Sequence, residues 1–166
     1  MASSQFTNFS PEYTHELHAA IGRFLLVCAT GEQFLGFQLA RATLHPNPMT
    51  VRGWMMFHGM ETKIKLERIC MAAPLIAETK SDEIIRTCDK IRNLYSRRND
   101  ICHNTNLMGD GDKLTLTVFK GFKRPIVKIY TIPQINLFCD HLIDRLRCID
   151  SLLTDAGVTP IPTQAN

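Results

Sequence analysis

The sequence lacks any apolar run of the roughly 20 residues that a membrane-spanning helix needs. Its first ten residues also lack the basic and then apolar layout of a secretion signal. No internal repeat or low-complexity tract is present, and a composition of 45% hydrophobic and 21% charged residues is unlike that of a disordered chain. We therefore expect one ordered, soluble domain in the cytoplasm, with no membrane partner.

The six cysteines include no CxxC pair and no histidine at the spacing of a zinc site. Most lie singly among apolar neighbours at helical spacing, where a reduced cysteine behaves as a small hydrophobic residue. The sequence therefore predicts no disulfide, metal site or other cofactor. A net charge of +3 permits a polyanionic partner without requiring one.

Apolar residues recur at spacings of three and four in four segments, which predicts four helices. The first is expected to begin after a cap at Ser10-Pro11 and to end near Leu44, before two prolines. The second is expected over about residues 50–76, and the third opens at Ser81, followed by two acids. The fourth runs from Pro133 to about Gly157.

Between the third and fourth helices the period changes to that of β-strands. Residues 108–112 are interpreted as a loop, and Leu114, Leu116 and Val118 then alternate with threonines. A second β-rich run over residues 126–130 is predicted to pair with the first as a hairpin.

Together these segments predict an all-α fold, a four-helix bundle with a small β-hairpin inserted between the third and fourth long helices. We expect one domain over residues 11–157, with flexible segments at 1–10 and 158–166. A lone hairpin is only marginally stable, so it should lean on the bundle or on another subunit.

Polar residues concentrate near the end of the third helix, in residues 96–106. At about 100° per residue, Arg98 and Asn99 fall on or beside an arc of apolar residues, which consists of Ile84, Cys88, Ile91, Tyr95 and Cys102. Such polar groups need partners, a wet cleft or an interface. His103 shares the side of Asn99, whereas Arg98 lies about 140° from His103. The two converge only if the arginine reaches around, the helix end distorts or a second chain completes the site.

Residues 98–103, Arg-Asn-Asp-Ile-Cys-His, resemble the R-x4-6-H signature of HEPN domains, a family of helical nucleases and nucleotide-binding modules. The place of the motif, late in a helix of an α bundle, agrees with that family. The resemblance implies RNA cleavage without a metal ion, in which the ribose 2′-hydroxyl attacks the neighbouring phosphate. It implies His103 as general acid or base, Arg98 as the group that stabilises charge on phosphorus, and Asn99 as a residue that orients the substrate or His103.

The partners that the resemblance implies are RNA or a nucleotide, a second copy of the chain across the motif and, for a toxin or defence effector, an antitoxin protein. Arg97, beside the motif, is expected to contact RNA. Lys120, Lys123 and Arg124 are expected to do the same, because no acid occurs between residues 112 and 140. Lysines on an exposed hairpin also block sheet aggregation, and that interpretation is equally open.

Two further interpretations of the motif remain open. The chain could be a non-catalytic module that uses the same cleft to bind a nucleotide or a partner protein. Alternatively, the motif has a structural role alone, because Arg and His near a helix C-terminus complement the helix dipole.

Overall fold

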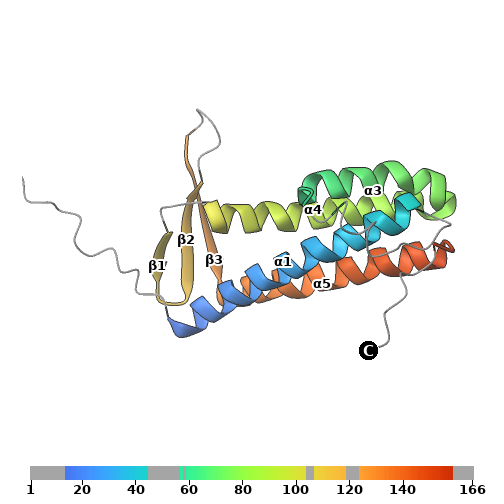
Figure 1. Ribbon diagram of the computed structural model, residues 1–166. Coiled ribbons are helices and arrows are strands. Elements are labelled where there is room, and N and C mark those ends of the chain that lie inside the picture. Colours follow the sequence, from blue (N-terminus) through green and yellow to red (C-terminus); the bar gives the residue numbers. More distant parts are fainter. Residues whose placement is uncertain (1–13, 45–56, 58, 104–106, 119–123, 159–166) are drawn as a thin grey trace, which may run out of the picture.

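The computed structural model describes residues 14–44, 57, 59–103, 107–118 and 124–158. Within them lie four α-helices and a 3-10 turn, η1, in the order α1 (His15–Leu44), α3 (Thr62–Ile76), η1 (Glu78–Lys80), α4 (Ser81–His103) and α5 (Ile132–Asp155). The helices form a bundle, with a small sheet between α4 and α5 at one end (Figure 1). No helix in the described part of the chain is long and apolar enough to cross a bilayer. The predicted bundle with an inserted hairpin is confirmed.

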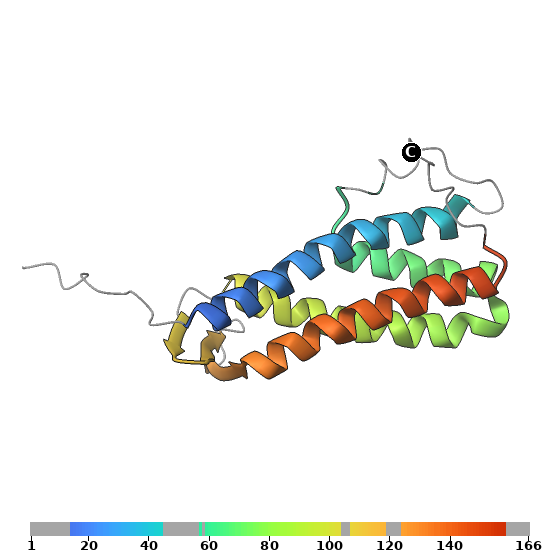
Figure 2. The same cartoon turned by 90° about the horizontal axis from the view of Figure 1, so that it is seen from below.

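Both α1 and α4 pack extensively against α3 and α5, so α1 and α4 occupy opposite corners of the bundle. They also meet in a small contact, where Tyr95 of α4 reaches α1. Figures 1 and 2 show α1 and α5 running along each other, while α3 lies beside only part of α4. With 15 residues, α3 is much shorter than α1, which has 30, and α4, which has 23. Because α3 is short, it does not reach the end of the bundle that carries the sheet, and the helices described at that end are α1, α4 and α5 (Figure 1).

The second helix, expected over about residues 50–76, is not continuous. Gly59, Met60 and Glu61 are not helical, and α3 begins at Thr62. The backbone N–H of Met60 donates instead to the Phe57 carbonyl, at 3.2 Å, in a turn. Glycine inside a helix costs about 1 kcal/mol relative to alanine, which favours a break at this point. Residues 50–56 and 58 lie outside the described part.

The first helix begins at His15, after Thr14. The Leu17 backbone N–H donates to Thr14 Oγ1 at 3.2 Å, so the threonine satisfies an N–H group that has no partner within the helix. Ser10 and Pro11, which were expected to start this helix, lie outside the described residues.

The sheet has three antiparallel strands in the order β1 (Leu107–Asp110), β2 (Lys113–Val118) and β3 (Ile126–Thr131). The hairpin of β2 and β3 is the predicted one. The interpretation of residues 108–112 as a loop is wrong for 108–110, because their backbone pairs with β2 as far as Asp110 opposite Lys113. Only Gly111 and Asp112 connect the strands, and Gly111 has a φ of 58°, which glycine adopts without steric cost.

The core fills the space between the four helices and continues beneath the sheet. The apolar stripes predicted for the helices are largely buried, among them Phe24, Leu35, Ile91 and Leu142, and so are Leu114 and Leu116 of β2. Cys102, which was placed on the buried arc of the third helix, is exposed instead. The predicted apolar arc is therefore buried as far as Tyr95. In the last turn of α4 the buried apolar residue is Ile101 and not Cys102. All six cysteines are free.

Candidate functional site: a basic cavity at the end of α4

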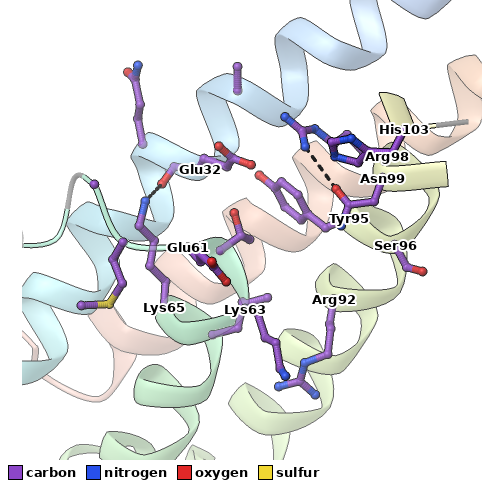
Figure 3. A pocket seen from close by; sticks show the side chains of 16 residues that line it. Glu32, Glu61, Lys63, Lys65, Arg92, Tyr95, Ser96, Arg98, Asn99 and His103 are labelled. Carbon is purple, nitrogen blue, oxygen red and sulfur yellow. Dashed lines mark hydrogen bonds between the residues drawn. The ribbon is translucent and has the colours of Figure 1, made fainter. Parts of the chain in front are cut away.

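Arg98, Asn99 and His103 line one cavity of about 810 Å³. Its walls come from α1, from the start of α3 and from the C-terminal half of α4 (Figure 3). Asn99 and His103 are exposed and Arg98 is half-buried, so all three are open to solvent. The structure thus brings the three predicted catalytic residues to the same cavity.

The offset between Arg98 and His103 is overcome by the length of the arginine. On α4, Arg92, Ser96, Asn99 and His103 line the cavity at successive spacings of four, three and four residues, which is one stripe of a helix. Arg98 lies beside that stripe and extends toward α1 (Figure 3). Its guanidinium NH1 donates to Asn99 Oδ1 at 3.1 Å. This hydrogen bond joins Arg98 to the stripe, and α4 remains helical through His103.

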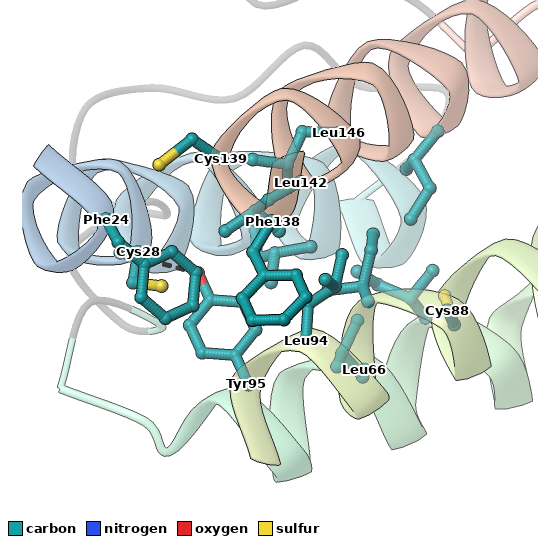
Figure 4. Close-up of a cluster of buried hydrophobic side chains, with 14 of the residues drawn as sticks. Phe24, Cys28, Leu66, Cys88, Leu94, Tyr95, Phe138, Cys139, Leu142 and Leu146 are labelled. Carbon is teal, nitrogen blue, oxygen red and sulfur yellow. Dashed lines mark hydrogen bonds between the residues drawn. The ribbon is translucent and has the colours of Figure 1, made fainter. Parts of the chain in front are cut away.

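Tyr95 forms the buried edge of the cavity. Its hydroxyl donates to the Cys28 carbonyl of α1 at 2.7 Å (Figure 4). Burial raises the pKa of Tyr95 far above its usual value, and it raises the pKa of the Cys28 thiol to about 12, so both groups stay neutral. A Cβ atom at Gly31 would lie 2.7 Å from the Tyr95 hydroxyl oxygen. Because Gly31 has no side chain, the Tyr95 hydroxyl can pack against the backbone of α1.

The wall opposite α4 is formed by α1 and α3. Lys65 is 2% exposed, and its Nζ donates to the Glu32 carbonyl at 2.9 Å, which fastens α3 to α1. Burial lowers the pKa of Lys65, because the low-dielectric surroundings disfavour its charged form. Glu61 precedes α3 and makes no side-chain capping bond. The Glu61 side chain therefore does not cap the first backbone N–H groups of α3, and Thr62 and Lys63, which carry two of these groups, border the cavity.

Positive charge dominates the cavity lining. Among the residues that the structure describes, the lining contains four lysines and arginines and the imidazole of His103, against two carboxylates. These charged side chains are Lys63, Lys65, Arg92, Arg98, Glu32 and Glu61. An anionic group is therefore favoured at the basic positions, and the carboxylates can accept hydrogen bonds from amino or hydroxyl groups. Among the described residues, no group of three or more histidine, cysteine or acidic side chains could hold a metal ion.

Comparison with protein-family models, curated proteins and solved structures finds no match to this chain. The resemblance to HEPN domains therefore depends on the motif and on the helical layout. The motif lies on α4, and the helical layout is that of the four-helix bundle.

Arg97 and Arg124, two of the residues predicted to bind RNA, are not among the residues that line this cavity. The guanidinium carbon of Arg97 lies 4.3 Å from the centre of the Phe138 ring, in a cation–π contact with α5. Arg124 is exposed just before β3. Lys120 and Lys123 lie outside the described residues.

Asp100, in the middle of the motif, connects α4 to the sheet. Its Oδ2 accepts a hydrogen bond from Lys128 Nζ of β3, and both side chains are largely shielded from solvent, with 11% and 27% exposed. Lys128 also belongs to the stretch without acids between residues 112 and 140, but the structure pairs it with this carboxylate of α4. The pair fastens the last turn of α4, which carries His103, to β3.

The sequence interpretation missed the cavity residues outside the motif. Arg92 could have been found, because it lies seven residues before Asn99 and eleven before His103 and so shares their face of the helix. Lys63 and Lys65 carried no such signal, because they reach the cavity from a helix about 30 residues away in the sequence.

Proposed function

We propose that this chain is a HEPN-type endoribonuclease that cleaves RNA without a metal ion, with its active site in the cavity at the end of α4. The observation that supports this most is that Arg98, Asn99 and His103 line one solvent-reachable cavity, although Arg98 lies beside the stripe of α4 that Asn99 and His103 share. The excess of positive side chains in the lining favours a phosphodiester there.

The proposed reaction needs few groups. The ribose 2′-oxygen forms a bond to phosphorus while the bond from phosphorus to the 5′-oxygen breaks, which gives a 2′,3′-cyclic phosphate and a free 5′-hydroxyl. Two protons move: one leaves the 2′-hydroxyl and one reaches the leaving 5′-oxygen. His103 makes one of these transfers and water makes the other. Arg98 stabilises the negative charge on the phosphate oxygens through its paired N–H donors. Asn99 keeps Arg98 in place through the hydrogen bond between them.

The test is an RNase assay with single-stranded RNA in the presence of EDTA. We expect the wild-type protein to cleave it and His103→Ala to be slower by about 100-fold or more. The control is His141→Ala, which removes an exposed histidine of α5 outside the cavity lining and should leave the rate unchanged. Circular dichroism checks that both variants are folded. Equal activity of the two variants, or intact RNA with the wild-type protein, contradicts the proposal.

We further propose that the nuclease acts as a homodimer. A groove of about 350 Å³ runs between α1 and α5 and is lined mostly by apolar side chains, among them Leu26, Val27, Phe34 and Ile143. Leu26 is 69% exposed, and an apolar groove of this kind is favourable for a second copy to cover. Because α1 lines both the groove and the cavity, a dimer across the groove would bring both cavities close to the contact.

A second function is favoured by the acids in the cavity. Glu32 and Glu61 can accept hydrogen bonds from the amino groups of a base, and the cavity volume is within the range of small-molecule pockets. These features fit a module that binds a nucleotide without cleaving RNA. Intact RNA in the assay, together with a nucleotide that binds in competition with RNA, would establish this function instead.

A further inference from the structure

The cavity has two separate groups of positive side chains. Arg98 and His103 lie at the end near the sheet, while Arg92 and Lys63 are directed toward the other end in the view of Figure 3. Arg92 and Arg98 are six residues apart, or about 9 Å along the helix axis at the α-helical rise. Because their side chains point toward different ends, one phosphate cannot occupy both positions.

Among the described residues, Arg92 and Lys63 each form an ion pair within their own helix. Arg92 pairs with Asp89 one turn earlier, and Lys63 with Glu67 one turn later at 3.9 Å, and all four side chains are well exposed. Exposed pairs of this kind contribute little to stability, so a ligand can displace them at small cost. Arg92 Nε is buried and has no hydrogen-bond partner among the described residues, so the terminal guanidinium nitrogens, of which Nη1 contacts Asp89, are the ones that can turn to an anion. These nitrogens and the Lys63 amine are therefore the groups available to an anion that enters the cavity.

The two carboxylates complete the arrangement. In Figure 3, Glu61 lies between the two cationic groups, Glu32 lies on α1 across from Arg98, and the buried Lys65 lies on the side of Glu61 away from α4. A negatively charged backbone is disfavoured at the carboxylates, whereas a ribose hydroxyl or a base amino group can donate to them. The order of groups along the cavity, cationic then acidic then cationic, matches a nucleoside held between two phosphates.

From this order we propose that Arg92 and Lys63 form a second phosphate subsite, so that the cavity binds a single-stranded RNA by two backbone phosphates on either side of one nucleoside. The identification of the ligand as RNA rests on the proposed function. The subsite itself rests on the positions of the cations. The RNA backbone then runs along α4 from His103 toward Arg92, and the phosphate held by Arg98 is the one that is cleaved.

The experiment measures the binding of a fluorescent four-nucleotide 2′-O-methyl RNA by anisotropy. This probe has no free 2′-hydroxyl to attack its internal phosphates, so it reports binding alone. We expect Arg92→Gln to weaken binding about tenfold through the lost charge-assisted hydrogen bonds. The slope of log K against log salt should also become shallower, by about 0.7 for one phosphate contact. Lys63→Gln should act in the same direction.

The matched control is Arg86→Gln, which removes the same charge from an exposed position of α4 outside the cavity. General attraction of RNA to the helix predicts equal effects of the two substitutions, and a direct phosphate contact predicts a clear loss for Arg92 alone. Equal effects, an unchanged salt slope, or no binding by the wild-type protein overturn the subsite. Binding that depends on Arg92, together with intact 2′-hydroxyl RNA in the nuclease assay, supports the subsite and overturns the nuclease.

Discussion

The substitution Gly31→Ala tests how closely α1 and α4 must approach beside the cavity. The added Cβ would lie 2.7 Å from the Tyr95 hydroxyl oxygen and 3.0 Å from Leu146 Cδ1. The tyrosine would have to move, and the hydrogen bond of 2.7 Å from its hydroxyl to the Cys28 carbonyl would be strained or lost. Because Tyr95 also lines the cavity, the shift would reach the candidate site.

The expected change in the free energy of unfolding has three contributions. Replacing a helical glycine by alanine is favourable by about 1 kcal/mol. Forcing an extra carbon into a packed contact costs about 1–3 kcal/mol. Losing the buried hydrogen bond costs about 1 kcal/mol more. The sum is a net destabilisation of about 1–3 kcal/mol, against the gain that helix propensity alone would give.

The same helix offers a matched control. A Cβ at Gly22 would meet no atom within 4 Å, so Gly22→Ala should stabilise the protein by about 1 kcal/mol. Urea denaturation measures both variants and should therefore give opposite signs. If Gly31→Ala stabilises the protein as Gly22→Ala does, the close packing of Tyr95 against α1 is refuted.

A double-mutant cycle identifies the atom responsible. Tyr95→Phe removes the oxygen that the new Cβ would meet first and leaves Leu146 Cδ1 at 3.0 Å and the ring carbon Cζ at 3.8 Å. Gly31→Ala should then cost at least about 1 kcal/mol less in the Tyr95→Phe background than in the wild type. An equal cost in both backgrounds would mean that the hydroxyl is not the obstacle.

Two further predictions concern the dimer and the sheet. Leu26→Asp places a charge in the groove between α1 and α5 and should convert the proposed dimer to a monomer in analytical ultracentrifugation, whereas Leu75→Asp, at an 87% exposed position of α3, should not. A dimer that survives Leu26→Asp would contradict the groove as its interface. Lys128→Met leaves the shielded Asp100 carboxylate without this partner and should lower the free energy of unfolding by about 1–3 kcal/mol in urea denaturation. A change below about 0.5 kcal/mol would show that the pair does not hold α4 to the sheet.

The helices could be predicted because their signals are local. Spacings of three and four apolar residues determine which face of each helix is buried, and the third helix was expected to open at Ser81, which is the first residue of α4. The start of α5 was missed by one residue. Thr131 and Gln134 form a capping box there, in which the Thr131 backbone N–H donates to Gln134 Oε1 at 2.9 Å. Their spacing of three residues is a signal that the sequence does contain.

Strand β1 could not be predicted from its own residues. The segment from Met108 to Asp110 has little β-propensity and no alternation of apolar and polar residues, because it includes a glycine and an aspartate. It becomes a strand because β2 supplies the backbone partners. The tight connection at Gly111 and Asp112 sets the register of that pairing.

Only part of the candidate site could be predicted from the sequence, for the same reason. The motif on α4 is contiguous and could be recognised, whereas the opposite wall depends on where α3 begins. The chain is not helical at residues 59–61, and α3 begins at Thr62. Lys63 and Lys65 of its first turn therefore border the cavity, and no local signal in the sequence indicates that these two residues face the motif on α4.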